Sequence, residues 1–340
     1  MNAVEFDNVS IVFGDKPASA LPLMDAGQQR AEISAACNQI LGVHNCSLTV
    51  EDGEILVLMG LSGSGKSTLL RAVNGLNPVV RGNVRVKTGD TMTSVSGADR
   101  KALRDLRLRT VAMVFQQFGL LPWRNVRDNV GLGLELDGQS AATRRARVDE
   151  ELEGVGLLDR ADALVGELSG GMQQRVGLAR AFATDAPILL MDEPFSALDP
   201  LIRSRLQDDL LDMQAKRGRT IIFVSHDLDE AFKLGNRIAI MEGGRIVQCG
   251  TPQDIYSNPA NDYVGDFVAH MNPLSVLCAR DVMEPVTGAP STTVAAETSI
   301  RVVMGQLGED ETLIGVIEGG KMIGQISKYR ILAKLSNLRS

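Results

Sequence analysis

A glycine-rich segment at Gly60–Thr68, with the sequence GLSGSGKST, carries the residues whose chemistry is easiest to recognise. Its spacing fits the pattern G-x-x-x-x-G-K-[ST], in which backbone N–H groups surround phosphate oxygens. In this pattern the lysine reaches the β- and γ-phosphates and the next hydroxyl binds Mg²⁺. At average composition, such a match arises by chance in roughly one chain in a hundred of this length. The predicted nucleotide-binding residues of this phosphate loop are Gly60, Ser62, Gly63, Gly65, Lys66, Ser67 and Thr68, with Ser67 also a predicted Mg²⁺ ligand.

Two carboxylates follow the apolar run Ile188–Met191 and are candidates for the same chemistry. Acidic residues at the carboxyl end of a parallel strand face the crevice in which open α/β sheets bind ligands. Asp192 is therefore predicted to hold Mg²⁺, directly or through water. Glu193 is predicted to polarise a water aimed at the γ-phosphate. Acidic residues after strands are common, so this prediction depends on the presence of the phosphate loop in the same chain.

A third candidate is the segment Leu168–Arg175, with the sequence LSGGMQQR. A serine followed by two glycines is typical of a helix start that binds an anion. It is equally typical of a plain helix cap or a loop, because serine is a favoured N-cap residue. The residues alone leave both interpretations open.

The elements that must position these residues are visible as apolar patterns. Glu54–Met59, before the phosphate loop, is the continuous apolar run expected of a parallel strand that is buried on both faces. After the loop, apolar residues recur at helical spacing up to Leu76. Further apolar runs at Ile188–Met191 and Ile221–Val224 predict neighbouring strands. The pattern indicates an α/β fold built around a mostly parallel sheet.

Composition narrows the class of protein. The chain has 340 residues, enough for two or three domains, with 44% hydrophobic and 23% charged residues. Its net charge of −7 argues against bulk binding of nucleic acid. No apolar run reaches the ~18 residues of a membrane span, and the acidic start lacks the apolar region of a secretory signal. Four scattered cysteines predict a reduced, cytosolic chain without a disulfide scaffold or structural zinc.

The combined motifs resemble the nucleotide-binding subunits of ATP-binding cassette (ABC) proteins. The likeness covers roughly residues 4–268 and extends to the order of the family's motifs. It implies that Gln116 is the Q-loop glutamine that ligates Mg²⁺ and borders the membrane subunit. His226 would contact the γ-phosphate, and Asp199 would belong to the D-loop of Ser196–Asp199. Phe13 lies where the family places an aromatic residue that stacks on adenine, although an aromatic near a first strand is also typical of a core.

The resemblance also implies a mechanism. ATP and Mg²⁺ would be held by the phosphate loop of one subunit, and Ser169 and Gly171 of a second copy would close over the γ-phosphate. Two ATP molecules would thus lie between two chains, so that neither site is complete in a monomer. Closure would exclude bulk water and complete the electrostatic stabilisation, with Glu193 as the catalytic base. The working assembly is therefore expected to contain a homodimer.

Within the ABC proteins, this sequence resembles the separate ATPase of an importer. It would be peripheral, on the cytoplasmic face of the plasma (inner) membrane, and bind an integral membrane permease. A periplasmic or extracellular solute-binding protein would be an indirect partner. The segment Phe118–Arg124, with the only tryptophan of the chain at Trp123, is expected either to receive the permease or to pack inside the helical subdomain.

The branch is suggested by a long stretch between Phe13 and the strand at 54–59, which includes a helix-like pattern at Ala26–Ile33. Together with Asp199–Arg203 and Asn258–Val264, it resembles the quaternary-amine uptake family, whose substrates are choline, glycine betaine and proline betaine. Two alternatives stay open. One is an importer of another substrate, such as an amino acid. The other is a soluble ABC ATPase with no part in transport.

The C-terminal segment resembles a single CBS motif. Arg280–Met283 would open it, Thr312–Ile317 and Met322–Ser327 would be strands around a turn, and Tyr329–Leu335 a closing helix. The module is expected to pair with its copy, either to sense ionic strength or a nucleotide or only to dimerise. Arg330 stands where nucleotide-binding versions often have an acidic ribose ligand. The expected domains are a nucleotide-binding domain at 1–270, with a helical subdomain at about 100–180, and a linker and CBS-like α/β module at 271–340.

Overall fold

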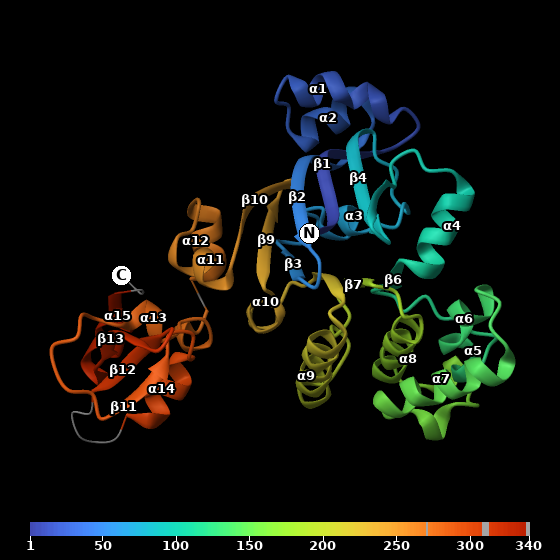
Figure 1. The fold of residues 1–340 in the computed structure, drawn as a ribbon. Helices are drawn as coiled ribbons and strands as arrows, with labels where there is room; N and C mark the ends of the chain where they lie inside the picture. Colours follow the sequence, from blue (N-terminus) through green and yellow to red (C-terminus); the bar gives the residue numbers. More distant parts are fainter. Residues whose placement is uncertain (270, 308–312, 338–340) are drawn as a thin grey trace. The chain divides into compact units, whose positions relative to one another are not determined.

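The computed structural model describes residues 1–269, 271–307 and 313–337, which divide into two compact units (Figure 1). The first unit contains Met1–His226 and Leu234–Cys249. The second contains Asp227–Lys233 and the chain from Gly250 onwards. Each unit has a hydrophobic core of its own. No helix in the described part of the chain has both the length and the apolar character needed to cross a bilayer.

A six-stranded sheet of order β10-β9-β3-β8-β7-β6 organises the first unit. Its strands are β3 (Ile55–Met59), β6 (Val111–Val114), β7 (Ile188–Asp192), β8 (Thr220–Val224), β9 (Arg237–Glu242) and β10 (Arg245–Gly250). The pairs β6–β7, β7–β8, β8–β3 and β3–β9 are parallel. Every residue of β3, β7 and β8 is buried, as their continuous apolar runs predict. The predicted α/β fold with a mostly parallel sheet is confirmed.

The register of the parallel strands brings three motifs to one edge of this sheet. Leu58 of β3 and Asp192 of β7 both pair with Val224 of β8. The residues that follow the three strands are therefore neighbours, although they come from distant parts of the sequence. The phosphate loop leads from β3 into the short helix α3 (Lys66–Leu70). Helix α9 (Pro200–Arg217) follows β7, and α10 (Leu228–Leu234) follows β8.

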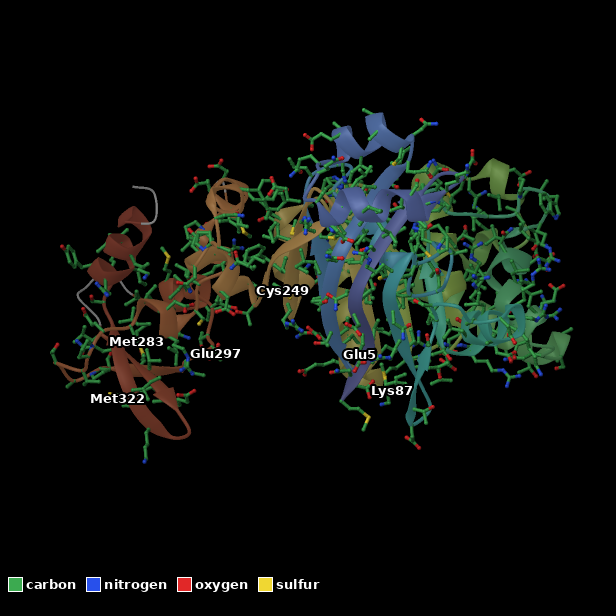
Figure 2. The ribbon with its side chains drawn as sticks, turned by 90° about the horizontal axis from the view of Figure 1, so that it is seen from above. Glu5, Lys87, Cys249, Met283, Glu297 and Met322 are labelled. Atoms are coloured by element: carbon green, nitrogen blue, oxygen red, sulfur yellow. The ribbon has the colours of Figure 1, made fainter. Side chains whose placement is uncertain are left out.

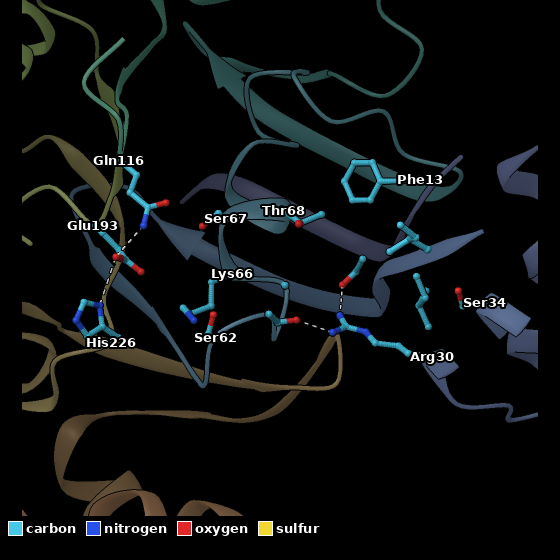
Figure 3. A pocket seen from close by; sticks show the side chains of 15 residues that line it. Phe13, Arg30, Ser34, Ser62, Lys66, Ser67, Thr68, Gln116, Glu193 and His226 are labelled. Atoms are coloured by element: carbon cyan, nitrogen blue, oxygen red, sulfur yellow. Dashed lines mark hydrogen bonds and ion pairs between the residues drawn. The ribbon is translucent and has the colours of Figure 1, made fainter. Parts of the chain in front are cut away.

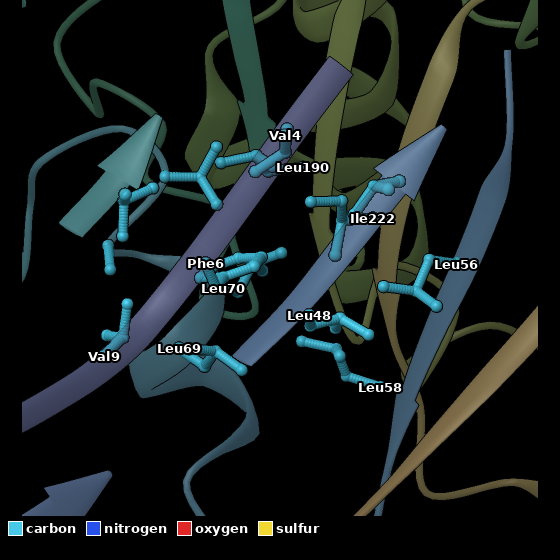
Figure 4. Close-up of a cluster of buried hydrophobic side chains, with 14 of the residues drawn as sticks. Val4, Phe6, Val9, Leu48, Leu56, Leu58, Leu69, Leu70, Leu190 and Ile222 are labelled. Atoms are coloured by element: carbon cyan, nitrogen blue, oxygen red, sulfur yellow. The ribbon is translucent and has the colours of Figure 1, made fainter. Parts of the chain in front are cut away.

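A second, four-stranded antiparallel sheet of order β2-β1-β4-β5 was not predicted from the sequence. It consists of β1 (Asn2–Phe13), β2 (Ile40–Glu51), β4 (Arg81–Thr88) and β5 (Thr91–Ser94). Its buried face contributes to the main core, where Phe6 of β1 lies beside Leu70 of α3 (Figure 4). Ion pairs on the solvent side join neighbouring strands, such as that between Arg85 and Glu5, at 3.3 Å. Glu5 is labelled in Figure 2. This sheet places Phe13 at the end of β1.

The long stretch after Phe13 forms a small helical insertion, residues 14–39, between β1 and β2. It contains a 3-10 turn at Pro17–Ala20, α1 (Leu21–Asp25) and α2 (Arg30–Cys37). The expected helix at Ala26–Ile33 is wrong at its start. Gly27 has a φ of +79°, and the Gln29 N–H donates to Glu32 Oε2 at 2.7 Å, so that the helix begins at Arg30. Ile33 of α2 packs in a minor core with residues of β1, β2 and α1.

The helical part of the first unit has a separate cluster of buried side chains. Its helices are α5 (Val126–Val130), α6 (Leu132–Leu136), α7 (Ala141–Gly154) and α8 (Gly170–Ala183), with 3-10 turns at Leu158–Arg160 and Val165–Glu167. The cluster begins near residue 120 rather than at the expected 100. The reason is that Leu106 of α4 (Arg100–Arg109) and Val111 of β6 pack in the main core instead.

The second unit is an α/β module. Its elements are α11 (Pro252–Ser257), α12 (Asp262–Val268), a 3-10 turn at Pro273–Ser275, α13 (Ala279–Val282), β11 (Thr292–Ala295), α14 (Ile300–Gln306), β12 (Ile314–Glu318), β13 (Lys321–Ile326) and α15 (Lys328–Asn337). Strands β11 and β12 are parallel, and β12 and β13 form a hairpin. Its turn holds Gly319 and Gly320 at φ of +56° and +78°, as the predicted turn requires. Two residues at expected boundaries lie outside the described residues: His270, the last of the expected nucleotide-binding domain, and Thr312, the first of an expected strand.

The boundary between the units lies earlier than the expected residue 270. Tyr256 of α11 packs against the core of the C-terminal module, and Gln253 Nε2 donates to the Val276 carbonyl at 3.4 Å. These contacts group α11 and α12 with the module. Within it, Met283 covers Gly324 of β13 so closely that a Cβ there would lie 2.7 Å from the sulfur (Figure 2).

Candidate nucleotide-binding site

The backbone of the phosphate loop requires glycine at defined positions. Gly60, Gly63 and Gly65 have φ of +139°, +78° and +105°, which side chains of L-residues disfavour. A Cβ at Gly60 would lie 2.1 Å from the Met241 carbonyl oxygen, and one at Gly65 would lie 2.7 Å from the Gly42 carbonyl oxygen. The loop is thus pressed against neighbouring backbone on two sides.

Lys66 lies across its own loop. Its Nζ donates to the carbonyl oxygens of Gly60 and Leu61 at 2.7 and 2.9 Å, and the residue is 6% exposed. Burial lowers the pKa of Lys66, while the charges of Glu193 and Asp192 act in the opposite direction. An ammonium group carries three N–H donors, so one donor stays available for a phosphate oxygen.

Ser67 and Asp192 meet beneath the loop. Ser67 Oγ donates to Asp192 Oδ1 at 2.7 Å, and Arg71 Nη2 donates to Asp192 Oδ2 at 2.8 Å. Asp192 is fully buried, so both carboxylate oxygens need these partners. Arg71 was not among the site residues predicted from the sequence. Its spacing of four residues from Ser67 was a usable signal, because residues four apart share one face of a helix.

Glu193 is held in an uncommon conformation beside two polar side chains. Its φ is +49°, and its N–H donates to the Val224 carbonyl at 3.1 Å. Gln116 Nε2 donates to Glu193 Oε2 at 3.1 Å, and His226 Nδ1 lies 3.4 Å from the same oxygen (Figure 3). A carboxylate oriented in this way is suited to accept a proton from water.

These groups line one cleft of about 600 Å³ (Figure 3). Its predicted lining residues are Phe13, Ser62, Gly63, Gly65, Lys66, Ser67, Thr68, Gln116, Glu193 and His226. Five further residues were not predicted: Arg30, Ser34, Ile40, Leu41 and Gly42. Phe13 is 37% exposed and lines the cleft, so it is not a core residue. Gly60 and Asp192 do not line the cleft, because they lie below the loop surface.

Besides Gly60 and Asp192, three more predicted residues are not among those that line the cleft. Ser169 Oγ accepts from the Met172 N–H at 3.4 Å at the start of α8. Asp199 Oδ1 accepts from the Ile202 N–H at 3.0 Å at the start of α9. Gly171 lies against the D-loop, where a Cβ would be 3.5 Å from the Ala197 carbonyl oxygen. Within one chain these residues are helix caps and loop contacts. No group of three or more His, Cys, Asp or Glu side chains in the described ranges has the arrangement of a metal site.

Comparisons with known proteins agree with this geometry. The family model described as ABC transporter matches residues 43–196. The glycine betaine/proline betaine transport system ATP-binding protein ProV of Salmonella typhimurium is 45% identical over 98% of this chain and 82% of its own length. The trimethylamine N-oxide transport system ATP-binding protein TmoW of Ruegeria pomeroyi is 43% identical over 96% of this chain and 94% of its own.

Among solved structures, a dimeric post-hydrolysis state of the ATP-binding cassette MJ0796, bound to ADP and Pi, is similar to this chain with a TM-score of 0.63. It is 29% identical and covers 73% of this chain and 98% of its own. The phosphate loop, the buried aspartate and the oriented glutamate thus occur in a chain whose sequence and fold both match ATP-binding cassettes. The chain belongs to the ATP-binding subunits of ABC transporters and is an ATP hydrolase of that family.

Proposed function

We propose that this chain is the ATPase of an importer for quaternary amines, such as glycine betaine, proline betaine or choline, and works with a separate permease. The observation that carries the proposal is the 45% identity to the Salmonella glycine betaine/proline betaine protein over 98% of the chain. This overlap includes the insertion and the C-terminal unit, so the likeness is not limited to the motifs that all ABC ATPases share.

The proposed site roles follow from the geometry of the cleft. Lys66 and the loop amides bind the phosphates, and Phe13 stacks on the adenine. Glu193 is the base for the attacking water, with His226 beside the γ-phosphate. Ser67 and Asp192, 2.7 Å apart, provide the oxygen donors that Mg²⁺ prefers, and Gln116 is a third ligand. When bound, Mg²⁺ would neutralise the charge that develops on the phosphates.

A homodimer would complete this site. Ser169, Gly171 and Asp199 lie outside the cleft of their own chain but on exposed or half-exposed helix starts. In the proposed dimer, they approach the nucleotide held by the partner subunit. The dimeric state of the MJ0796 cassette supports this arrangement.

A surface of the helical part is the proposed docking site of the permease, which would keep the subunit at the cytoplasmic face of the plasma membrane. Trp123 is 73% exposed there, so it does not pack inside the helical subdomain. Gly119, from the same segment as Trp123, lines a largely apolar cleft of about 460 Å³. Its apolar lining includes Leu76, Leu108, Phe115, Leu132 and Leu136. Exposed aromatic and aliphatic side chains at a cleft are typical of interfaces. An external solute-binding protein would deliver the amine to the permease.

The C-terminal unit is proposed to be a CBS-like module that pairs with its copy. Its order of strand, helix, two strands and helix supports this interpretation. Tyr329 is 80% exposed and would be covered by the partner. Exposed charge pairs such as Arg280–Glu297, at 3.2 Å, respond to ionic strength and are compatible with a sensor role.

A second substrate is favoured by a specific observation. The Ruegeria trimethylamine N-oxide protein matches this chain along 94% of its own length, so its domain organisation is also similar. Trimethylamine N-oxide and glycine betaine both carry methyl groups on a four-coordinate nitrogen. A permease that binds one of them presents a pocket of related shape.

Transport by the reconstituted complex tests the proposal. The chain is combined with its permease and binding protein in liposomes that contain ATP, and uptake of labelled glycine betaine, choline, trimethylamine N-oxide and methionine is measured. We expect ATP-dependent uptake of a methylated amine and none with the Glu193→Gln variant. Uptake of methionine alone, or failure to bind any permease, would overturn the assignment.

A further inference from the structure

The helical insertion contributes a basic side chain to the nucleotide cleft. Arg30 is the first residue of α2, thirty positions before the start of the phosphate loop in sequence. Its Nη1 donates to the Gly63 carbonyl oxygen at 2.5 Å, and its Nη2 donates to that of Gly42 (Figure 3). The guanidinium is therefore fixed against the phosphate loop itself.

The charge of Arg30 lacks a counter-ion in the described part of the chain. Both of its hydrogen-bond acceptors are neutral carbonyl groups, and its Nε is buried without a partner. Burial lowers the pKa of Arg30. A cation is also disfavoured at the first turn of a helix, where the macrodipole is positive. Within the chain alone, this position is therefore unfavourable for the charge of an arginine. An anion in the cleft would offset the cost of burying that charge.

Arg30 lies at the end of the cleft opposite the catalytic groups. Gly42, whose carbonyl it binds, is in close contact with both Phe13 and Thr68. A Cβ at Gly42 would lie 2.9 Å from Phe13 Cε2 and 3.0 Å from Thr68 Cγ2. Glu193 and His226 are at the other end, and Lys66 lies between (Figure 3). Arg30 therefore faces the nucleoside end and the first phosphates rather than the γ-phosphate.

We propose that Arg30 is a nucleotide-binding residue, whose guanidinium stabilises the phosphate chain of ATP and ADP from the nucleoside end of the cleft. The insertion is thereby part of the binding site and not only a surface feature. The inference depends on the ATP hydrolase activity and not on the identity of the transported amine.

Calorimetric titration of the full-length chain with ADP and with ATP, both with Mg²⁺, tests this role. For Arg30→Gln we expect about a tenfold weaker affinity, the scale of one lost charge-assisted hydrogen bond. The loss should be the same for ADP as for ATP, because the γ-phosphate is not involved. Arg30→Lys keeps the charge but not the two-pronged guanidinium, so its affinity should lie between those of the parent and Arg30→Gln. In steady-state hydrolysis, Arg30→Gln should raise KM while kcat stays nearly constant.

Arg81→Gln is the matched control. Arg81 binds Asp25 of α1 through two contacts, at 2.5 and 2.9 Å, so it tethers the same insertion without lining the cleft. It should leave both affinities unchanged. Parent-like nucleotide binding by Arg30→Gln would overturn the proposal. So would an equal loss in Arg81→Gln, because the effect would then come from the tether of the insertion and not from Arg30. Thermal melting of each variant separates misfolding from weakened binding.

Discussion

Gly60 and Gly63 both have positive φ, but a side chain would meet different surroundings at the two positions. At Gly60 a Cβ would lie 2.1 Å from the Met241 carbonyl oxygen, whereas at Gly63 nothing lies within 4 Å. Gly63→Ala should therefore cost about 1–2 kcal/mol of unfolding free energy, from its backbone conformation alone. Gly60→Ala should cost more by roughly 1–3 kcal/mol, because the backbone must shift. Chemical denaturation measures both, and equal costs would contradict the close contact with Met241.

The residues of the site differ in whether nearby sequence is enough to predict them. The loop residues from Gly60 to Thr68 could be predicted because one contiguous segment performs one task, and spacing alone reveals it. Arg71 had a local signal in its helical spacing. Arg30 had none, since its role depends on how the insertion folds back onto Gly63 and Gly42. Motif analysis cannot predict a side chain whose role depends on contacts with residues that are distant in sequence.

Among the elements, α8 is joined through Gln174 to the loop between β7 and α9 of the same chain, which contains Glu193. This residue is 1% exposed. Its Nε2 donates to the Glu193 carbonyl at 3.4 Å, and its Oε1 accepts from the Ala197 N–H at 3.2 Å. In the proposed dimer α8 serves the partner's ATP while Glu193 serves its own. In that dimer, the hydrogen bonds of Gln174 would link the two nucleotide sites.

Gln174→Leu, which conserves volume, should reduce kcat for ATP hydrolysis several-fold and leave nucleotide affinity unchanged. The reason is that the Ala197 N–H and the Glu193 carbonyl each lose a hydrogen bond, at a cost of about 0.5–1.5 kcal/mol per bond, next to the side chain of the proposed base. Gln173→Leu is the control. Among the residues that the structure describes, the Gln173 side chain donates only to the carbonyls of Val165 and Leu168, both at 3.1 Å, within the helical part. If both variants lost the same activity, the connection to Glu193 would not be the cause.

Strands differ in how well their sequences identify them. Buried parallel strands such as β3 and β7 are continuous apolar runs bounded by motifs, so they were predicted nearly to the residue. The antiparallel sheet of β1, β2 and β4 was missed. Its strands have one exposed face, and β1 pairs with β2 only across the insertion, so neither composition nor local spacing indicates the pairing. The start of α2 was predicted four residues too early. The positive φ of Gly27 keeps that residue out of the helix, and the apolar spacing does not reveal this.

In the proposed dimer, one chain alone has an incomplete active site, and this predicts that the rate per chain depends on protein concentration. With Ser169 and Gly171 outside the cleft, hydrolysis should require two chains, so the rate per chain should rise with protein concentration until the dimer saturates. Phosphate release measured over a hundredfold dilution series tests this.

Glu193→Gln should lower kcat by at least about a hundredfold, the typical contribution of a general base. It should also give an ATP-dependent dimer in sedimentation, because the γ-phosphate is retained. A constant rate per chain in a monomeric sample would show instead that one chain completes its own site, and the roles of Ser169 and Gly171 across the dimer would be wrong.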